Sequence, residues 1–197
     1  MKTKQMMEKN NQQDGAKQAP AKIVAMKIMK ALAERPSVKP SDGSRGRLVV
    51  IDSPASLGLA DNTTLMLYIV KQTAVDEGRP SAYFSLGTQN TEIVNILVSI
   101  ITGIGLQKIE SGRLSDEEFA LLNEKLPSLN DAPLYIDDTE GMTLDWLDGR
   151  LTDLATEDNV TFAVIEHVRH LGGDAETVPA IKAVAERLGI TVIAVMD

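Results

Sequence analysis

The residues with the clearest chemical meaning lie in a run of small side chains, residues 53–60 (SPASLGLA), between an apolar segment and a helical one. A turn between a strand and a helix can point free backbone N–H groups at an anion, so it could cradle phosphate. The phosphate-binding loop of nucleotide hydrolases reads G-x-x-x-x-G-K-[ST]. Here Ser53 stands at the first glycine position and Gly58 at the second. The pattern indicates a vestigial nucleotide-binding loop made of Ser53, Ser56, Leu57, Gly58, Leu59 and Ala60.

Two positions of this loop lack the groups that phosphoryl transfer needs. Leu59 replaces the lysine that reaches the β- and γ-phosphates, and Ala60 replaces the hydroxyl that binds Mg²⁺. Asp61 adds a charge that repels phosphate, and Thr63 and Thr64 lie too far along the chain to replace the hydroxyl directly. Taken alone, the loop fits an ordinary strand-to-helix turn as well as a phosphate site.

Other polar groups could bind a metal or transfer protons. His167 and His170 lie near the end of an expected strand, but no convincing third ligand accompanies them. Asp137, Asp138 and Glu140 form a carboxylate cluster, for which strand-end and helix-capping roles are the better interpretation. The chain has no cysteine, which excludes disulfides and thiolate metal sites. We therefore expect no metal site.

The elements that position these residues alternate along the chain. Strands are expected at residues 47–52, 81–86, 133–137, 161–166 and 191–196, and helices at 62–77, 91–101, 115–125, 143–155 and 178–188. The strands are near-continuous apolar runs, which is typical of strands buried on both faces. Alternation with helices predicts an α/β fold with a doubly wound, mainly parallel sheet and helices on both faces. Ligands of such sheets bind outside the carboxyl ends of the strands.

The segment before the sheet has a different character. Residues 1–16 are predicted to be a disordered tail, and residues 17–45 an amphipathic linker helix followed by a flexible linker. The apolar side of the helix carries Ile23, Val24, Ile28 and Leu32, which we expect to contact a protein partner, another copy of the chain or its own domain. Residues 46–197 are expected to form the folded domain.

Charge limits the kinds of partner. Residues 1–50 hold 11 Lys and Arg against 4 Asp and Glu, whereas residues 51–197 hold 9 against 24. The folded part is therefore a poor nucleic-acid binder, and DNA could be held only weakly, through the basic N-terminal arm. No apolar run is long enough to span a bilayer, and no signal peptide is recognisable. We expect a cytoplasmic protein that does not bind membranes.

Four runs of sequence resemble the C-terminal RecA-like motor domain of DnaB-type replicative helicases. These are LYIVKQTAVDEGRPSAYFSL at residues 67–86, the stretch at 103–147 that contains GRLSDEEFALL and APLYIDDTEGMTLDWL, TFAVIEHVRHL at 161–171, and IKAVAERLGITVIAV at 181–195. The resemblance covers residues 46–197 and implies a RecA-like P-loop NTPase fold. It also implies ATP and Mg²⁺ as the family's cofactors, ATP-dependent DNA unwinding as its activity, and assembly into rings.

The departures from the family's pattern fall on catalytic positions. Gly87 stands where the resemblance places the general base, so that base is lost. Glu166 replaces the Walker B aspartate, and Arg169 replaces a glutamine that contacts the γ-phosphate. The loop after Arg169 lacks the family's DNA-binding lysines and arginines, and the sequence stops at Asp197, before the last helicase motif and its arginine finger.

Two functions of different classes follow from this pattern. The first is a pseudoenzyme: a DnaB-like domain without catalytic residues or cofactor, acting as an accessory or interaction protein in DNA replication. The second is an ATP-binding helicase or ATPase subunit with a non-standard P-loop, in which Lys71, Lys108 or Arg169 replaces the missing lysine. An evolutionary remnant without a present function is a third reading.

Overall fold

Five parallel strands form one sheet in the computed structural model, which describes Ala25, residues 46–51 and residues 62–196. The strand order across the sheet is β1-β5-β4-β2-β3. The strands are β1 (Arg47–Ile51), β2 (Ser81–Ser85), β3 (Leu134–Asp137), β4 (Phe162–Glu166) and β5 (Thr191–Val195). All five lie within one residue of their predicted bounds, because apolar runs bounded by polar residues mark buried strands clearly.

The central strands are buried on both faces. Along β4, Phe162 and Val164 face one hydrophobic cluster, whereas Ala163 and Ile165 face the other. Successive side chains of a strand point to opposite faces, so both clusters need a covering layer of helices. The predicted doubly wound α/β architecture is therefore confirmed for the described residues.

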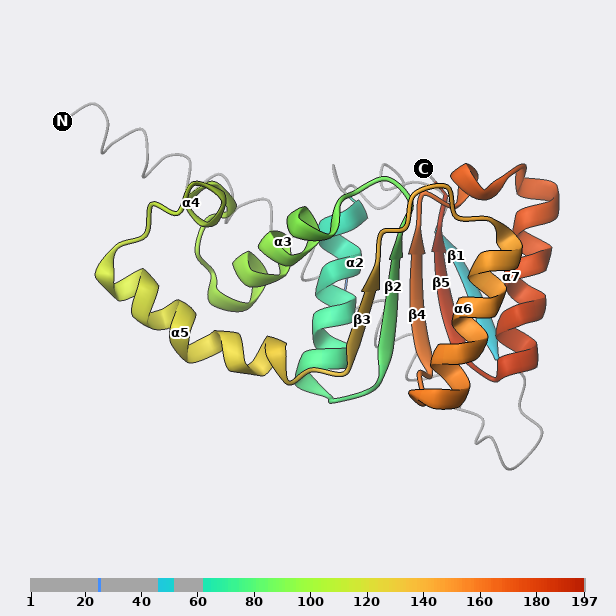
Figure 1. The fold of residues 1–197 in the computed structure, drawn as a ribbon, viewed down its shortest axis with the longest axis horizontal. Coiled ribbons are helices and arrows are strands. Elements are labelled where there is room, and N and C mark those ends of the chain that lie inside the picture. The colour runs from blue at the N-terminus through green and yellow to red at the C-terminus, as the bar shows by residue number, and fades with distance from the viewer. Residues whose placement is uncertain (1–24, 26–45, 52–61, 197) are drawn as a thin grey trace.

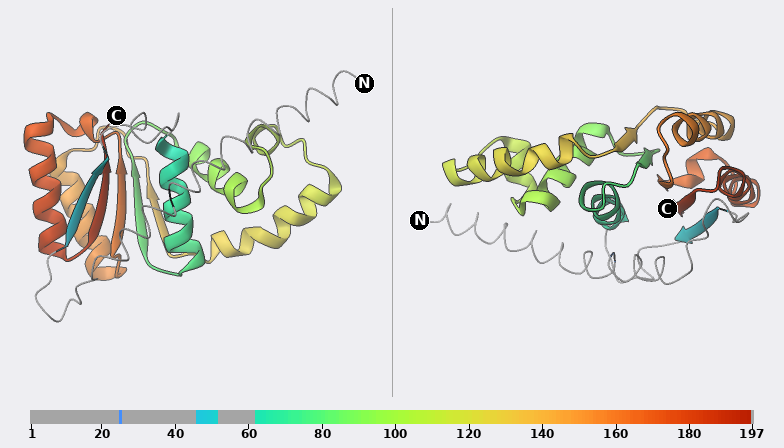
Figure 2. Two further views of the ribbon diagram at one scale, coloured as in Figure 1. Left: turned by 180° about the vertical axis from the view of Figure 1, so that it is seen from behind. Right: turned by 90° about the horizontal axis from the view of Figure 1, so that it is seen from below.

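The two layers of helices cover opposite faces of the sheet (Figure 1, Figure 2). On one face lie α2 (Asn62–Val70), the short π-helix η3 (Lys71–Asp76) and α3 (Asn90–Thr102). The other face is covered by α6 (Leu144–Glu157) and α7 (Asp174–Leu188), while η4 (Val168–Leu171) connects β4 to α7. The amphipathic spacing of α6 explains its position, since its buried residues, Leu147, Leu151 and Leu154, lie on a single side.

Two further helices extend beyond the β3 edge of the sheet (Figure 1). They are α4 (Leu106–Ser111) and α5 (Asp116–Asn130), which lead from α3 to β3. None of the residues in α4 or α5 is fully buried. Local hydrogen bonds therefore contribute more to the stability of this extension, α4 and α5, than core packing does. At its start, α5 has a capping box in which the Ser115 hydroxyl accepts from the Glu118 N–H and the Glu118 carboxylate accepts from the Ser115 N–H.

Four helical features differ from the sequence predictions. Helix α5 ends at Asn130 rather than at residue 125, so Pro127 lies inside it. The predicted helix at 62–77 becomes a π-helix from Lys71, where the Glu77 N–H bonds to the Gln72 carbonyl five residues earlier. Helix α7 begins at Asp174 rather than at residue 178, so Pro179 lies inside it rather than at its start. Helix α4 was not predicted, because six residues between two glycines are too short to show a helical period.

The predicted N-terminal tail and linker lie outside the described residues, except for Ala25. That residue is helical and only 4% exposed, and it belongs to the cluster that also contains residues of α2 and α3. Ile23, Val24, Ile28 and Leu32 are not described, so their predicted contacts stay a prediction. Within the described ranges, no helix is both long and apolar enough to cross a membrane.

Candidate functional site

The carboxyl ends of the strands and the start of α2 lie at the same end of the sheet, which we call the carboxyl edge (Figure 1). Ligands of open parallel sheets bind at such an edge. The predicted phosphate loop follows β1 here, but Ser53, Ser56, Leu57, Gly58, Leu59 and Ala60 lie outside the described residues. The structure does describe Glu166, Arg169 and Gly87, which the sequence places at the ends of β4 and β2.

Glu166 is the last residue of β4 and is completely buried. Its Oε2 accepts a very short hydrogen bond from the Tyr83 hydroxyl and a second from Thr63 Oγ1 at 3.3 Å. Tyr83 comes from β2 and Thr63 from the first turn of α2. The carboxylate therefore joins three elements, and one of its oxygens already has two donors. Hydrogen bonds of this kind compensate part of the cost of removing a carboxyl group from water.

Sequence reasoning missed the partners of Glu166. The sequence places Tyr83 in a strand without indicating a partner, and it places Thr63 too far along to replace the P-loop hydroxyl. In the sheet, Ser85 pairs with Glu166 and Tyr83 pairs with Val164, so Tyr83 is the diagonal neighbour of the carboxylate on the same face. A buried tyrosine hydroxyl needs a hydrogen-bond partner, which is the signal that could have identified this contact once the strand register was known.

Gly87 lies in the turn after β2, against the imidazole of His167. A Cβ at position 87 would come within 3.4 Å of that ring. His167 follows Glu166 directly and has a left-handed backbone, with φ of 54°, which turns the chain sharply away from β4. The turn that carries Gly87 is closed by Ser85, whose hydroxyl accepts from the Thr88 N–H at 2.9 Å. An imidazole ring therefore packs beside the position where the resemblance implies a catalytic carboxylate.

The two histidines form a stacked pair, with ring centroids 5.7 Å apart and ring planes 26° apart. His170 Nδ1 lies 2.8 Å from the Leu86 carbonyl oxygen. A carbonyl can only accept, so His170 carries its proton on Nδ1 and donates it. Among the described residues, no group of three or more His, Cys, Asp or Glu could hold a metal ion.

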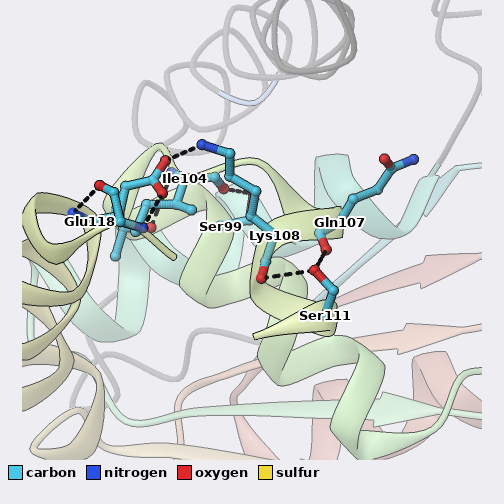
Figure 3. Close-up of polar contacts among 8 residues, drawn as sticks. Ser99, Ile104, Gln107, Lys108, Ser111 and Glu118 are labelled. Atoms are coloured by element: carbon cyan, nitrogen blue, oxygen red, sulfur yellow. Dashed lines mark hydrogen bonds and ion pairs between the residues drawn. The ribbon is translucent and has the colours of Figure 1, made fainter. Parts of the chain in front are cut away.

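The three cations that could replace the P-loop lysine lie in different places. Lys71 is nine residues after the start of α2, roughly 13 Å along the helix, and its Nζ bonds to Asp76 at 2.7 Å. Lys108 lies on α4, beyond the sheet edge, and its Nζ contacts Glu118 at 2.5 Å, as Figure 3 shows. Arg169 alone is at the carboxyl edge, exposed on η4 directly after β4.

The carboxylates at the end of β3 have local partners. Asp137 Oδ1 accepts from the Thr139 hydroxyl at 2.7 Å, and Asp137 Oδ2 lies 3.5 Å from Arg150 Nε. Asp138 accepts from the N–H of Asn90 at 2.7 Å, so it caps the first turn of α3. These contacts agree with strand-end and capping roles for the acidic cluster.

The described side chains depart at two positions from the pattern that the resemblance implies for magnesium and a nucleotide triphosphate. The acidic group at the end of β4 is buried under a tyrosine hydroxyl, and position 87 has no side chain to orient a water molecule. The sequence supplies neither a lysine at position 59 nor a hydroxyl at position 60. What the edge does contain is a hydrogen-bonded structural joint between β2, β4 and α2.

Comparison with known proteins shows which sequences this chain is similar to. The family model described as "DnaB-like helicase C terminal domain" matches residues 42–196. The replicative DNA helicase DnaB of Mycobacterium intracellulare is 26% identical over 175 residues, which cover 80% of this chain and 30% of that protein. The DnaB helicase of Mycobacterium leprae is 29% identical over 130 residues, covering 62% and 22%. The chain thus spans about a third or less of the length of these curated relatives.

Solved structures show the same fold. The ATPase domain of G40P superposes with a TM-score of 0.66 at 19% identity, covering 77% of this chain and 57% of that one. A DnaB-like replicative helicase, solved in a study of its interactions with primase, gives a TM-score of 0.62 at 18% identity, covering 77% and 38%. The predicted RecA-like fold is therefore confirmed.

Proposed function

The chain belongs to the DnaB-like helicase C-terminal domain family, and from this premise we propose that it is a non-catalytic member, an accessory or interaction protein in DNA replication. The observation that carries the proposal is the buried joint of Glu166, Tyr83 and Thr63. In this joint Oε2 of the acidic residue of β4 accepts hydrogen bonds from both β2 and α2, so it links the sheet to that helix. The sequence supports the proposal as well, because it has no lysine at position 59, no hydroxyl at position 60 and no general base at position 87.

The expected rate of ATP hydrolysis follows from the number of groups that are absent. Phosphoryl transfer depends on positioning and charge stabilisation, and each of these groups contributes orders of magnitude to the rate. Losing several together leaves no measurable turnover above the uncatalysed rate. ATP and Mg²⁺ are accordingly not cofactors in this proposal.

A hydrolysis assay tests this part of the proposal. Purified protein, alone and with single-stranded DNA, should release no phosphate above the background of a no-protein control. The matched control is Glu166→Gln, which should give the same background. Turnover by the wild-type protein that Glu166→Gln abolishes would contradict the proposal and would favour an ATPase with a non-standard P-loop. Of the three candidate cations, Arg169 is the one at the carboxyl edge.

The interaction role involves protein partners rather than nucleic acid. The region from residue 51 onward holds 9 Lys and Arg against 24 Asp and Glu, which opposes binding to phosphate backbones. We assign partner binding or self-association to the amphipathic segment around Ile23, Val24, Ile28 and Leu32, in a cytoplasmic protein. Burial of Ala25 in the α2–α3 cluster supports packing of this segment on a RecA-like domain.

Removal of the N-terminal segment tests that assignment. A variant that lacks residues 1–36 should keep the circular dichroism of a folded domain but change its mass in size-exclusion chromatography with light scattering. The control variant lacks only residues 1–16 and should behave like the full chain. An unchanged mass and unchanged partner binding for the longer deletion would refute a role of this segment in association.

A further inference from the structure

The two faces of the sheet differ in how their helical layers reach the β1 edge. On one face α6 and α7 pack against each other, and α7 also packs against β1 and β5. On the other face α2 packs against β4, the middle strand, while α3 lies towards the β3 edge (Figure 1). The described helices that follow β1 in the chain therefore cover the middle and the β3 side of this second face.

Strands β1 and β5 nevertheless present buried apolar side chains to the second face. Ile193 and Val195 of β5 are fully buried, and Ile51 of β1 is 9% exposed. The outer strands of a five-stranded sheet lie roughly 19 Å apart, whereas a helix with its side chains is about 10–12 Å across. Helix α2 is too narrow to cover β1 and β5 as well as the middle of the sheet. The β1 side therefore needs a further apolar segment above it.

Ala25 is a described residue that can supply this cover. It is helical, 4% exposed, and belongs to the same cluster as Ile51, Ile193 and Val195. Residues 26–45 join it to Gly46 at the start of the sheet, and at about 3.3–3.6 Å per extended residue this connection is long enough to cross the whole sheet. The chain length therefore allows Ala25 to pack on the domain of its own chain.

We propose that the segment carrying Ala25 packs in cis over β1 and β5, and that this contact is autoinhibitory. The segment to which we assign partner binding is then held by its own domain, and a partner has to displace it. Its release uncovers Ile51, Ile193 and Val195, which form a second apolar surface. The inference rests on the proposed function, because it states how the binding segment of an interaction protein is regulated.

A single introduced thiol tests the contact, since the chain has no cysteine. Ala25→Cys replaces a methyl group by a small side chain that tolerates burial. Its reaction with a maleimide in the full-length protein is compared with that of Glu157→Cys, at an exposed position of α6. After each rate is divided by the rate in urea, we expect the thiol at position 25 to react at least about tenfold more slowly. Equal rates would overturn the inference.

Dilution distinguishes packing in cis from packing on a second copy. Protection within one chain does not depend on protein concentration, so the labelling rate at position 25 should stay constant while light scattering shows a monomer. Protection that is lost on dilution, in parallel with the dissociation of a dimer, would place Ala25 in the cluster of a second copy. That result would overturn the autoinhibitory contact.

Ala25→Glu tests the regulatory step, because it places a charge in the apolar cluster and should release the segment. Trypsin should then cleave after Lys22 and Lys27, on either side of position 25, about tenfold faster. The mass in light scattering should also rise, because the β1 side of the sheet is uncovered. Ala16→Glu makes the same change in the predicted tail and should alter neither result.

Two controls keep these results interpretable. If thermal denaturation shows that Ala25→Glu unfolds the domain, the labelling of Ala25→Cys decides. Unchanged proteolysis and mass in a folded Ala25→Glu variant would refute autoinhibition. The hydrolysis assay separates the two proposals: ATP turnover by the wild-type protein refutes the non-catalytic role, whereas rapid labelling at position 25 without turnover refutes the cis contact alone.

Discussion

Two glutamates of this protein illustrate opposite ways of holding a carboxylate. Glu166 lies at the carboxyl end of the middle strand of the sheet, completely buried, with a tyrosine and a threonine hydroxyl on one of its oxygens. Glu118 lies on α5, outside the sheet, and bonds to Lys108 and to the Ser115 N–H. Hydrogen bonds to Lys108 and Ser115 lower the pKa of Glu118.

The two carboxylates should respond differently to the loss of a hydrogen-bond partner. Around Glu166, removal of one donor leaves a buried carboxyl oxygen short of a hydrogen bond that water cannot replace, so the whole domain is destabilised. Around Glu118, water replaces a lost partner at little cost, and the effect stays within the α4–α5 extension. The carboxylate at the carboxyl edge is therefore part of the packed domain, whereas the extension has ordinary surface electrostatics.

The largest expected effect comes from Tyr83→Phe, which removes the hydroxyl from Glu166 and leaves the ring in place. We expect a loss of about 1–3 kcal/mol in the free energy of unfolding, because a buried carboxylate loses a donor. Chemical denaturation at pH 7 measures it. Tyr68→Phe is the matched control: its hydroxyl makes no described hydrogen bond, so that change should cost far less. Equal losses for the two variants would show that the contact with Glu166 contributes nothing.

A double-mutant cycle sharpens the same comparison. In a Glu166→Leu background there is no carboxylate to satisfy, so Tyr83→Phe should cost clearly less than in the wild type. The coupling free energy between the two positions should be about 1–2 kcal/mol. The same cycle on Lys108 and Glu118 should give about 0.5 kcal/mol or less. Similar coupling energies at the two sites would contradict the contrast between them.

Ser115→Ala tests the local bonds that hold the extension. The change removes the hydroxyl that accepts from the Glu118 N–H, and loss of such a cap costs about 1 kcal/mol. Hydrogen exchange should show faster opening of α5 and no change in β4. Ser128→Ala, which removes a hydroxyl bonded to the Lys125 carbonyl within the helix, is the control and should have a smaller effect. Faster exchange throughout the sheet would mean that the extension is not an independent region.

The smallest effect is the pH dependence of the Lys108 contact. Because the folded-state pKa of Glu118 is lowered, the stability that this group contributes is present above its unfolded pKa, about 4.3, and is lost as the pH falls through the folded value. Lys108→Met should therefore destabilise the protein slightly at pH 7, by about 0.5 kcal/mol or less, and this loss should shrink as the pH falls below about 4.3. A difference that stays constant as the pH falls would assign the effect to packing of the lysine stem.

The sequence predicted the sheet better than the site. Buried strands such as β4 have an apolar pattern that depends only on their own residues, so their bounds could be read directly. The contact of Tyr83 with Glu166 depends on which strands are neighbours and in what register, and neither is visible in one strand. The left-handed turn at His167, with its imidazole against Gly87, likewise arises from tertiary packing.

The π-helix after α2 is another feature that the sequence pattern could not predict. The Thr73 hydroxyl bonds to the carbonyls of Ile69 at 3.0 Å and Val70 at 3.1 Å. A side chain that bonds to the backbone of the preceding turn competes with the regular helical bonds. The helical period at residues 62–77 is the same with or without this change, so the sequence pattern could not reveal it.

Calorimetry with ATP, with and without Mg²⁺ and at high protein concentration, tests the central claim most directly. The account predicts no binding heat for the wild type and none for Tyr83→Phe, because the lysine and hydroxyl of the phosphate loop are absent. Micromolar binding of ATP that depends on Mg²⁺ and disappears in Glu166→Gln would contradict it. That result would show that Glu166 takes part in binding nucleotide and Mg²⁺ instead of only holding the Tyr83 hydroxyl, and that the protein retains the nucleotide binding of its family.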